Sequence, residues 1–301
     1  MTQRRTFNRS ALALTGVFAL ALALVGCSSG SGDAGGGDTD QTTLEKAQEE
    51  GSITLAVASE RPYSWVDESG EPTGATIAMH KQIFEALGID EIEVEEVAWD
   101  NLIPGLNAGR WDVVSAGMSI LPDRCAEAAF SDPEIMYTTT LAVPAGNPKG
   151  LSDLDSIAAA GDVKLAVQSG AIEDGYATDL GITDVVQVDT ASAGLEAVQS
   201  GRADAFALTA VSLNWMTEDM DDLETTEAFV QELDGVEQVG AGATVFRKAD
   251  TDLLEAYNEE LAGITGDEQS YLDLVEPFGF TAENLPPADL TTAQLCEGEL
   301  G

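Results

Sequence analysis

The sequence predicts an α/β protein built from two similar halves. Apolar runs of strand length alternate with segments of helical spacing, and the same alternation occurs twice along the chain. A strand at 53–57 is followed by a helix at 75–87, and a strand at 163–167 is followed by a helix at 172–180. Such alternation produces mostly parallel sheets whose two faces are covered by helices. We therefore expect two lobes, each a mostly parallel sheet flanked by helices.

In the first half, local signals define where each element starts and stops. Thr42 and Glu45 have the spacing of a capping box, and Gly51 ends the short helix that they begin. Ile77, His80, Phe84 and Leu87 recur at helical spacing until Gly88 stops that helix. The first half is thus expected to contain strands at 53–57, 92–97 and 112–116, and helices at 44–50, 75–87 and 100–108.

The second half repeats the pattern and then returns to the first lobe. Chain crossings between the lobes are expected near 141–146 and 236–242, which assigns residues 44–142 and 238–301 to lobe 1 and residues 143–237 to lobe 2. Its strands are predicted at 163–167, 185–188, 204–208 and 240–246, and its helices at 172–180, 191–200, 210–220, 250–264 and 267–277.

The composition excludes several classes of function. The 301 residues include 54 acidic and 13 basic side chains, for a formal net charge of −41, whereas a nucleic-acid binder needs a basic surface. His80 is the single histidine, which excludes metal sites with several His ligands and argues against a Ser-His-Asp enzyme. The three cysteines are far apart and lack the spacing of a zinc site. We expect no metal and no cofactor.

The N-terminus has the features of an export signal. Arg4 and Arg5 precede an uncharged apolar stretch at 11–26, which at about 1.5 Å per residue is too short to span a bilayer. The stretch ends in Leu-Val-Gly-Cys, which resembles a bacterial lipobox and predicts acylation of Cys27; the alternative is an ordinary buried cysteine. We expect a signal peptide at 1–26, exported by the general or the twin-arginine route, and a Gly/Ser/Asp-rich flexible tether at 27–43.

Short motifs along the folded part of the chain carry a family resemblance. They are LIPGL at 102–106, GRWD at 109–112, GMSILPDR at 117–124, FSDP at 130–133 and GRADA at 201–205. Together they resemble the polar-amino-acid family of extracellular solute-binding proteins of ABC importers. That resemblance implies a two-lobe, type II periplasmic-binding-protein-like fold (a Venus flytrap). It also implies a monomer, lipid-anchored on the outer face of the membrane, that delivers a small ligand to a permease and catalyses no reaction.

Further segments resemble the branch of that family that binds ectoine and hydroxyectoine, which are compatible solutes used in osmoprotection. Family members that bind amino acids place an ammonium-binding Asp where this chain has Thr209. They also often have Gly-Thr-Thr where this chain has Gly170, Ala171 and Ile172. Both departures favour a ligand other than an ordinary α-amino acid. The segments are PDRC at 122–125, AGNPK at 145–149, SGAIEDGYA at 169–177, ALTA at 207–210 and FGF at 278–280.

The anion end of the ligand is expected to meet Arg124. The resemblance implies that this residue binds the ligand carboxylate, and a guanidinium can do so with two parallel hydrogen bonds. Gly117 lets the backbone approach the ligand closely. Gly170, Ala171 and Ile172 are expected to supply second-lobe hydrogen bonds, as is Thr209. The alternative for Arg124 is a surface charge paired with one of the many acids.

The cation end is expected to meet aromatic faces and one carboxylate. Tyr63 and Trp99 match two walls of the aromatic box in the ectoine-binding branch, and Glu60 matches the carboxylate that faces the ring N–H groups. A diffuse cation over an aromatic ring gains about 0.5–2 kcal/mol. Ser119 takes the position of a third wall but is not aromatic, and Trp65 is a candidate to compensate. The alternative for Tyr63 and Trp99 is core packing.

Several alternatives remain open from the sequence. The same scaffold can bind a polar amino acid, or it can serve as the anchored partner of a sensor. Some chains with this fold are dehydratase-type enzymes, for which Glu60 and Glu173 would be the candidate acids or bases. Cys125 and Cys296 are either disulfide-bonded outside the cytoplasm or two free buried thiols. His80 is expected to be a packed core residue.

Overall fold

The computed structural model describes residues 41–298, which form two sheets with their flanking helices. The predicted signal peptide at 1–26, Cys27 and residues 28–40 of the predicted tether lie outside the described residues. The last part of the predicted tether is described and is not a flexible linker, because Thr42 caps α1 and Thr43 is its first residue. Within the described part of the chain, no helix combines the length and apolarity needed to cross a bilayer.

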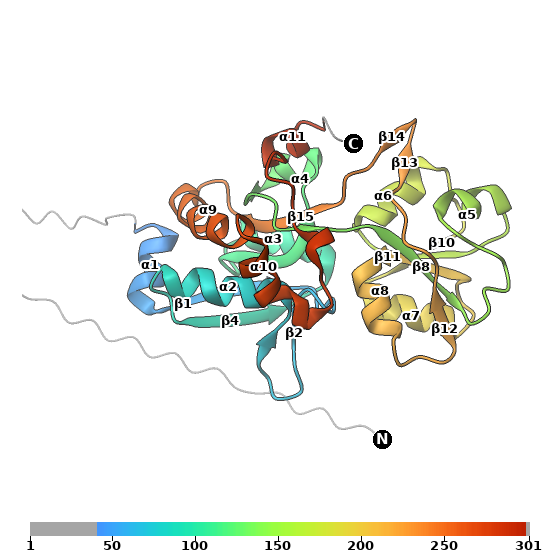
Figure 1. The fold of residues 1–301 in the computed structure, drawn as a ribbon, viewed down its shortest axis with the longest axis horizontal. Helices are drawn as coiled ribbons and strands as arrows, with labels where there is room; N and C mark the ends of the chain where they lie inside the picture. Colours follow the sequence, from blue (N-terminus) through green and yellow to red (C-terminus); the bar gives the residue numbers. More distant parts are fainter. Residues whose placement is uncertain (1–40, 299–301) are drawn as a thin grey trace, which may run out of the picture. The chain divides into compact units, whose positions relative to one another are not determined.

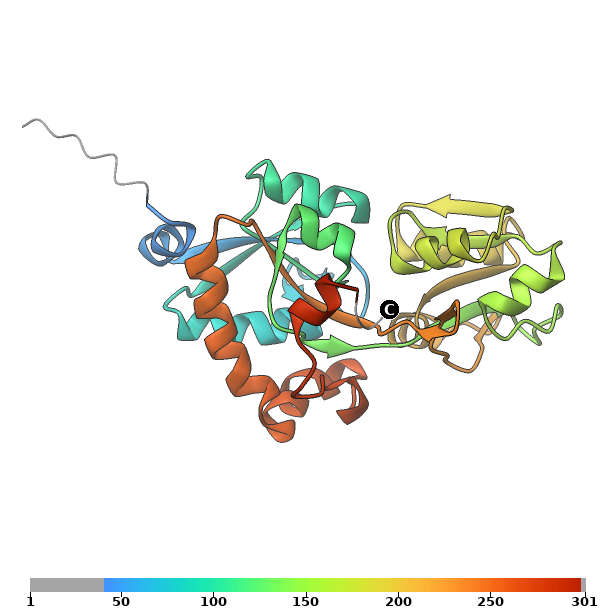
Figure 2. The same ribbon diagram turned by 90° about the horizontal axis from the view of Figure 1, so that it is seen from above.

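The first sheet has the strand order β4-β1-β5-β15-β6, and β7 also pairs with β15. Strand β1 runs parallel to β4 and β5, whereas β15 runs antiparallel to β5, so the sheet is mixed (Figure 1). Figure 2 shows α9, the long orange helix, running alongside this sheet. The strands are β1 (Ser52–Val57), β4 (Glu91–Glu96), β5 (Val113–Ser119), β6 (Ala129–Phe130), β7 (Ile135–Met136) and β15 (Ala241–Phe246). The helices are α1 (Thr43–Glu50), α2 (Ala75–Ala86), η1 (Trp99–Asn101), α3 (Leu102–Asn107), α4 (Pro122–Glu127), α9 (Thr251–Thr265), α10 (Glu268–Val275), η2 (Glu276–Phe278), η3 (Ala282–Asn284) and α11 (Thr292–Cys296).

The second sheet has the order β10-β9-β11-β8-β12, with β9 parallel to β10 and β11 and with β8 antiparallel to β11 and β12. Its strands are β8 (Thr139–Pro144), β9 (Leu165–Gln168), β10 (Val185–Val188), β11 (Ala205–Thr209) and β12 (Leu223–Thr225). Its helices are α5 (Leu154–Ala160), α6 (Ile172–Asp179), α7 (Ala191–Gln199) and α8 (Ala210–Thr217). The described part of the chain also contains two small ribbons, β2 (Trp65–Val66) with β3 (Pro72–Thr73), and β13 (Glu232–Leu233) with β14 (Val236–Glu237).

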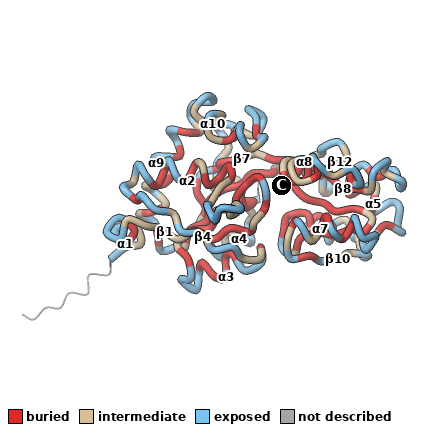
Figure 3. The backbone as a smooth tube through the Cα atoms, turned by 90° about the horizontal axis from the view of Figure 1, so that it is seen from below, coloured by how far each residue is buried: buried red, intermediate tan, exposed pale blue. Residues whose placement is uncertain are grey.

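Each sheet separates two apolar cores, because alternate side chains of a strand point to opposite faces. Leu55 and Val57 of β1 join the core beneath α2, α9 and α10, whereas Ala56 faces the core that contains Trp99 and Leu102. The second sheet repeats this division, with Val167 on the side of α5 and α6. In Figure 3 the central strands are accordingly red, while much of the helical surface is pale blue.

The lobe crossings correct one prediction. The crossing predicted near 141–146 is wrong, because residues 139–144 form strand β8 of the second sheet, with Leu141 opposite Ala207. The chain therefore passes between the sheets at residues 137–138, four residues before the predicted end of lobe 1, and returns at 238–240. Strands β8 and β15 each follow a crossing and each run antiparallel to a neighbour, so both sheets are less parallel than the sequence predicts.

Two open questions from the sequence are resolved by the structure. Cys125 of α4 and Cys296 of α11 form a disulfide with a Cα–Cα distance of 5.7 Å, which ties the C-terminal helix to the first lobe. His80 is a fully buried core residue, as predicted, and its ring nitrogens are within hydrogen-bonding distance of Thr244 and Ser115. Burial lowers the pKa of His80 to about 3, so the imidazole is neutral at physiological pH.

Candidate functional site

A small cavity lies between the two lobes, and residues of both lobes line it. The first lobe contributes the loop after β1, the turn η1 and the end of β5, and the second lobe contributes the start of α6 and the end of β11. The cavity volume is about 20 Å³, room for about one water molecule. A larger ligand therefore requires its walls to move apart. The lining residues are Glu60, Tyr63, Trp99, Ala116, Gly117, Ser119, Tyr137, Ala171, Ile172, Glu173, Leu208 and Thr209.

Gly117 is required where β5 meets the cavity. Its φ is +54°, a conformation that side chains rarely adopt, and a Cβ here would lie 2.5 Å from Cδ1 of Tyr63. The Tyr63 ring therefore packs directly on the backbone of β5. Tyr63 is 1% exposed, and its hydroxyl oxygen has no hydrogen-bond partner among the described residues. An unpaired buried hydroxyl is costly, so it is a natural partner for a polar ligand atom.

Glu60 connects the loop after β1 to the second lobe. Its Oε1 accepts hydrogen bonds from Ser212 Oγ at 2.6 Å and from Thr209 Oγ1 at 3.4 Å. Burial raises the pKa of the Glu60 carboxyl to about 7, although both hydrogen bonds oppose the shift. The sequence predicted Glu60 and Thr209 for this site. It gave no signal for Ser212, which reaches the site from the first turn of α8.

Glu173 brings a second carboxylate into the same cavity. It lies at the start of α6 and is 1% exposed, and Thr139 Oγ1 donates to its Oε1 at 3.4 Å. Burial raises the pKa of Glu173 to about 7, and the charge of Glu60 contributes to the shift. A folded-state pKa above the unfolded value stabilises the protein at low pH. This contribution is lost as the pH rises from about 4.5 to about 7. A bound cation would offset the free-energy cost of ionising these two buried carboxyls.

Arg124, which the sequence predicts to bind the ligand carboxylate, does not line the cavity itself. It lies beside the cavity with Gly170, in an adjoining surface pocket. Its Nη1 donates to the Ser119 carbonyl at 3.0 Å, and its Nη2 donates to the Gly170 carbonyl at 2.7 Å. Trp99 Nε1 donates to the same Gly170 carbonyl at 3.1 Å, and the guanidinium carbon lies 5.7 Å from the Trp99 ring centroid. The Gly170 carbonyl of the second lobe thus accepts hydrogen bonds from two side chains of the first lobe.

Trp65 is not brought to the cavity. Its strand β2 pairs with β3, and its ring lies in a separate groove, 6.5 Å from the Trp215 ring and 5.5 Å from the Arg61 guanidinium carbon. Trp65 therefore does not compensate for the small Ser119 side chain. Tyr137, which the sequence did not predict, does line the cavity and donates a hydrogen bond to Ser119 Oγ.

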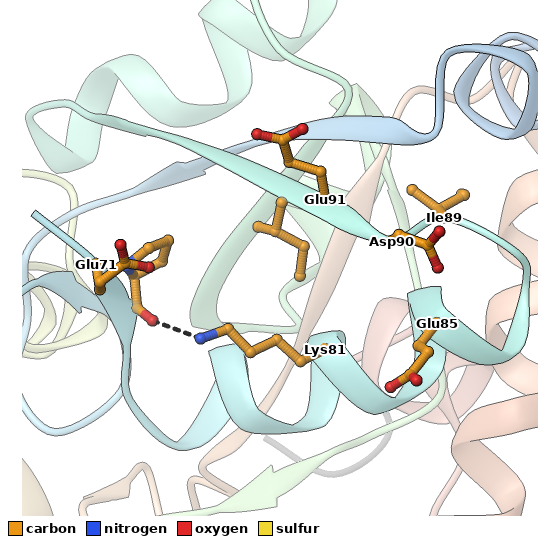
Figure 4. A pocket seen from close by; sticks show the side chains of 8 residues that line it. Glu71, Lys81, Glu85, Ile89, Asp90 and Glu91 are labelled. Carbon is orange, nitrogen blue, oxygen red and sulfur yellow. Dashed lines mark hydrogen bonds between the residues drawn. The ribbon is translucent and has the colours of Figure 1, made fainter.

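A larger hollow in the first lobe is a weaker candidate. Figure 4 shows Glu71, Glu85, Asp90 and Glu91 around it, with Lys81 donating to the Pro72 carbonyl at 2.9 Å. Its volume is about 510 Å³, but its carboxylates belong to exposed residues that water already solvates. The cavity between the lobes instead gathers buried polar groups with few partners, which is where a ligand gains most.

Comparisons with known proteins point to one family. The model described as bacterial extracellular solute-binding proteins, family 3, matches residues 53–276. The "Probable amino-acid ABC transporter periplasmic-binding protein y4tE" of Sinorhizobium fredii is 32% identical over 260 residues, 84% of this chain and 86% of that protein. The L-cystine-binding protein TcyJ of Escherichia coli is 26% identical over 232 residues, 76% and 83% of the two chains.

Solved structures are similar over nearly their full length. EhuB in complex with hydroxyectoine superposes with a TM-score of 0.76 at 31% identity, covering 84% of this chain and 97% of EhuB. The ancestral amino acid-binding protein AncCDT-1, a precursor of cyclohexadienyl dehydratase, gives a TM-score of 0.70 at 26% identity, covering 79% and 99%. These likenesses confirm the two-lobe, type II fold predicted from the sequence.

Proposed function

Because the chain belongs to the bacterial extracellular solute-binding proteins, family 3, and therefore binds a solute for an ABC importer, we propose that its solute is a small zwitterion captured between the lobes. The observation that carries this proposal is the charge layout of the cavity. Glu60 and Glu173 lie inside it with the rings of Tyr63 and Trp99, and Arg124 lies at its margin. A ligand with one cationic and one anionic end matches this layout.

We infer that the zwitterion is ectoine or hydroxyectoine. The cavity offers a diffuse cation two aromatic faces and carboxylates that accept N–H donors. Thr209, where amino-acid binders of this family have an ammonium-binding Asp, supplies no charge to hold a compact ammonium group. The likeness to EhuB, which was solved with hydroxyectoine, supports the same inference.

Ligand capture is proposed to work through lobe closure. Arg124 and Trp99 of the first lobe bond to Gly170 of the second, and Ser212 of the second lobe bonds to Glu60 of the first. A ligand that contacts both lobes adds to these contacts only when the lobes are closed, so it shifts the equilibrium toward the closed form. The permease then receives the closed, loaded protein.

Titration of the purified protein tests the ligand assignment. In calorimetry we expect tighter binding of ectoine or hydroxyectoine than of glutamine, glutamate, arginine or cystine, because the site holds a diffuse cation better than an ammonium group. If any of those amino acids binds more tightly, that amino acid replaces ectoine as the proposed ligand, while the fold and the transport role are unchanged. Conversion of cyclohexadienyl substrates by the protein, monitored in the same samples, would instead support a dehydratase-type enzyme.

We also propose that Cys27 is acylated and anchors the protein outside the cell membrane. The support is the apolar stretch at 11–26 that ends in Leu-Val-Gly-Cys and the polar tether that follows. In Cys27→Ala we expect the protein to move from the membrane fraction to the soluble extracellular fraction, whereas the control Ser28→Ala should stay with the membrane. Immunoblots of the two fractions measure this, and membrane retention of Cys27→Ala would contradict the anchor.

A further inference from the structure

Tyr137 is a wall of the cavity that no sequence motif predicts. It lies in the crossing between β7 of the first sheet and β8 of the second, and it is 8% exposed. It therefore belongs to neither sheet, unlike the cavity residues on β5 and β11.

Two contacts hold Tyr137 in place. Its N–H donates to the Gly240 carbonyl of the return crossing at 2.9 Å, and its hydroxyl donates to Ser119 Oγ at the end of β5. A Cβ at Gly240 would overlap the Tyr137 carbonyl oxygen and lie 2.8 Å from ring atom Cδ2. Because Gly240 has no side chain, the Tyr137 ring can pack directly against the backbone of the return crossing. The small side chain of Ser119 leaves room for the hydroxyl end of the ring.

The ring lies among the groups that would surround a cation. It meets the Tyr63 ring at a centroid distance of 6.5 Å and an interplanar angle of 87°, and Trp99 lines the same cavity. Burial raises the pKa of the Tyr137 hydroxyl; the hydrogen bond to Ser119 and the charge of Arg124 oppose this shift, and the charges of Glu173 and Glu60 add to it. Both carboxylates line the same cavity as the ring.

We propose that Tyr137 is a specificity-determining residue whose ring forms the third aromatic wall of the cavity, in place of the side chain that Ser119 is too small to supply. The cationic part of the ligand packs against it. This inference rests on the proposed function in one respect, that the ligand carries a positive charge. It does not require the ligand to be ectoine.

Graded fluorination of the ring tests this role. Phenylalanine, 4-fluorophenylalanine, 3,5-difluorophenylalanine and 3,4,5-trifluorophenylalanine are placed at position 137, and ectoine affinity is measured by calorimetry. Each fluorine weakens the negative face of the ring and changes its volume little. We expect affinity to fall steadily along the series, and Tyr137→Leu to weaken binding about two- to thirty-fold. Equal affinity along the series would mean that Tyr137 only fills space.

A reciprocal exchange provides an independent test. Ser119→Phe alone should lose at least about tenfold in affinity, because the new ring competes with Tyr137 for one space. Combining Ser119→Phe with Tyr137→Ser should recover most of this loss, because one ring again faces the cavity. Circular dichroism melts check that each variant folds. If the double variant binds no better than Ser119→Phe, the two positions do not share a wall and the proposal fails.

The ligand preference of the wild type separates the proposal for Tyr137 from the ligand assignment. If wild type prefers an amino acid to ectoine, the fluorinated series is repeated with that amino acid, whose ammonium group is also a cation. A steady fall then supports the Tyr137 wall although the ectoine assignment has failed. A wild type that binds neither ectoine, hydroxyectoine nor any amino acid contradicts both, because a wall for a cation requires a cationic ligand.

Discussion

Replacing Arg124 by alanine is expected to weaken binding of the zwitterion by roughly several hundred-fold to several thousand-fold while the protein remains folded. A charge-assisted hydrogen bond contributes about 1.5–3 kcal/mol, and a carboxylate left buried without its partner adds a desolvation penalty. Together they amount to about 3–5 kcal/mol. The variant also loses one link to Gly170, although Trp99 still donates to that carbonyl. Arg124 is half-buried at the edge of the cavity, so the cores should not be disturbed.

Two further variants sharpen this test. Arg124→Lys should recover only part of the affinity, because an ammonium group cannot form the two-pronged contact of a guanidinium. Arg202→Ala is the matched control, since Arg202 is exposed and its side chain has, among the described residues, one hydrogen bond, to the Ala193 carbonyl at 3.4 Å. Calorimetry gives the affinities, with circular dichroism as the folding control. A folded Arg124→Ala protein that binds within about threefold of wild type would reduce this arginine to a surface charge.

Most elements of the fold follow from local signals in the sequence. The helix predicted at 75–87 is found as Ala75–Ala86, and the strand predicted at 185–188 is found at those residues. The capping box of Thr42 and Glu45 is present at the start of α1. These elements depend on residue spacing and on capping residues only a few positions apart, so a single sequence is enough to predict them.

The first crossing could not be placed in the same way. Residues 139–144 suit a strand of either lobe, and the assignment of this strand depends on its pairing with β11, more than 60 residues away. Register and direction between strands so distant in sequence are long-range properties that no local pattern encodes. The same limit hid the antiparallel direction of β15 in the first sheet.

The site was predictable only where a family motif covered it. Gly117 lies in such a motif, and Glu60, Tyr63 and Trp99 match positions of the ectoine-binding branch; all four line the cavity. Tyr137 and Ser212 line or support the cavity through contacts with partners far away in sequence, so no motif marks them. Trp65 was a candidate for the site but lies outside the cavity. It is close in sequence to Glu60 and Tyr63, but the ribbon of β2 and β3 places its side chain in a separate groove.

Glu60→Gln is expected to weaken binding of the cationic end roughly 10- to 100-fold at pH 8, by analogy with other hydrogen bonds to charged groups. The amide keeps the shape of the side chain and can still accept from Ser212, but it carries no charge to attract the ligand. Glu71→Gln is the matched control, since Glu71 lies in the exposed hollow of the first lobe. Equal affinities of wild type and Glu60→Gln at pH 8 would show that this carboxylate does not face the ligand.

The pH dependence of binding separates the charge of Glu60 from its hydrogen bonds. Burial raises the pKa of Glu60 and of Glu173 to about 7, so both carboxyls become protonated in the ligand-free protein as the pH falls below that value. A cation requires the ionised form, and binding must then release protons, so wild-type affinity should rise with pH and level off above about 7. Glu60→Gln should reduce this dependence, and Glu60→Gln combined with Glu173→Gln should remove it. Calorimetric titrations from pH 5.5 to pH 8.5 measure the slope. An affinity of wild type that is flat over this range would mean that the ligand does not contact either carboxyl through its charge, because the protonation of two buried acids facing one cation cannot leave its affinity unchanged.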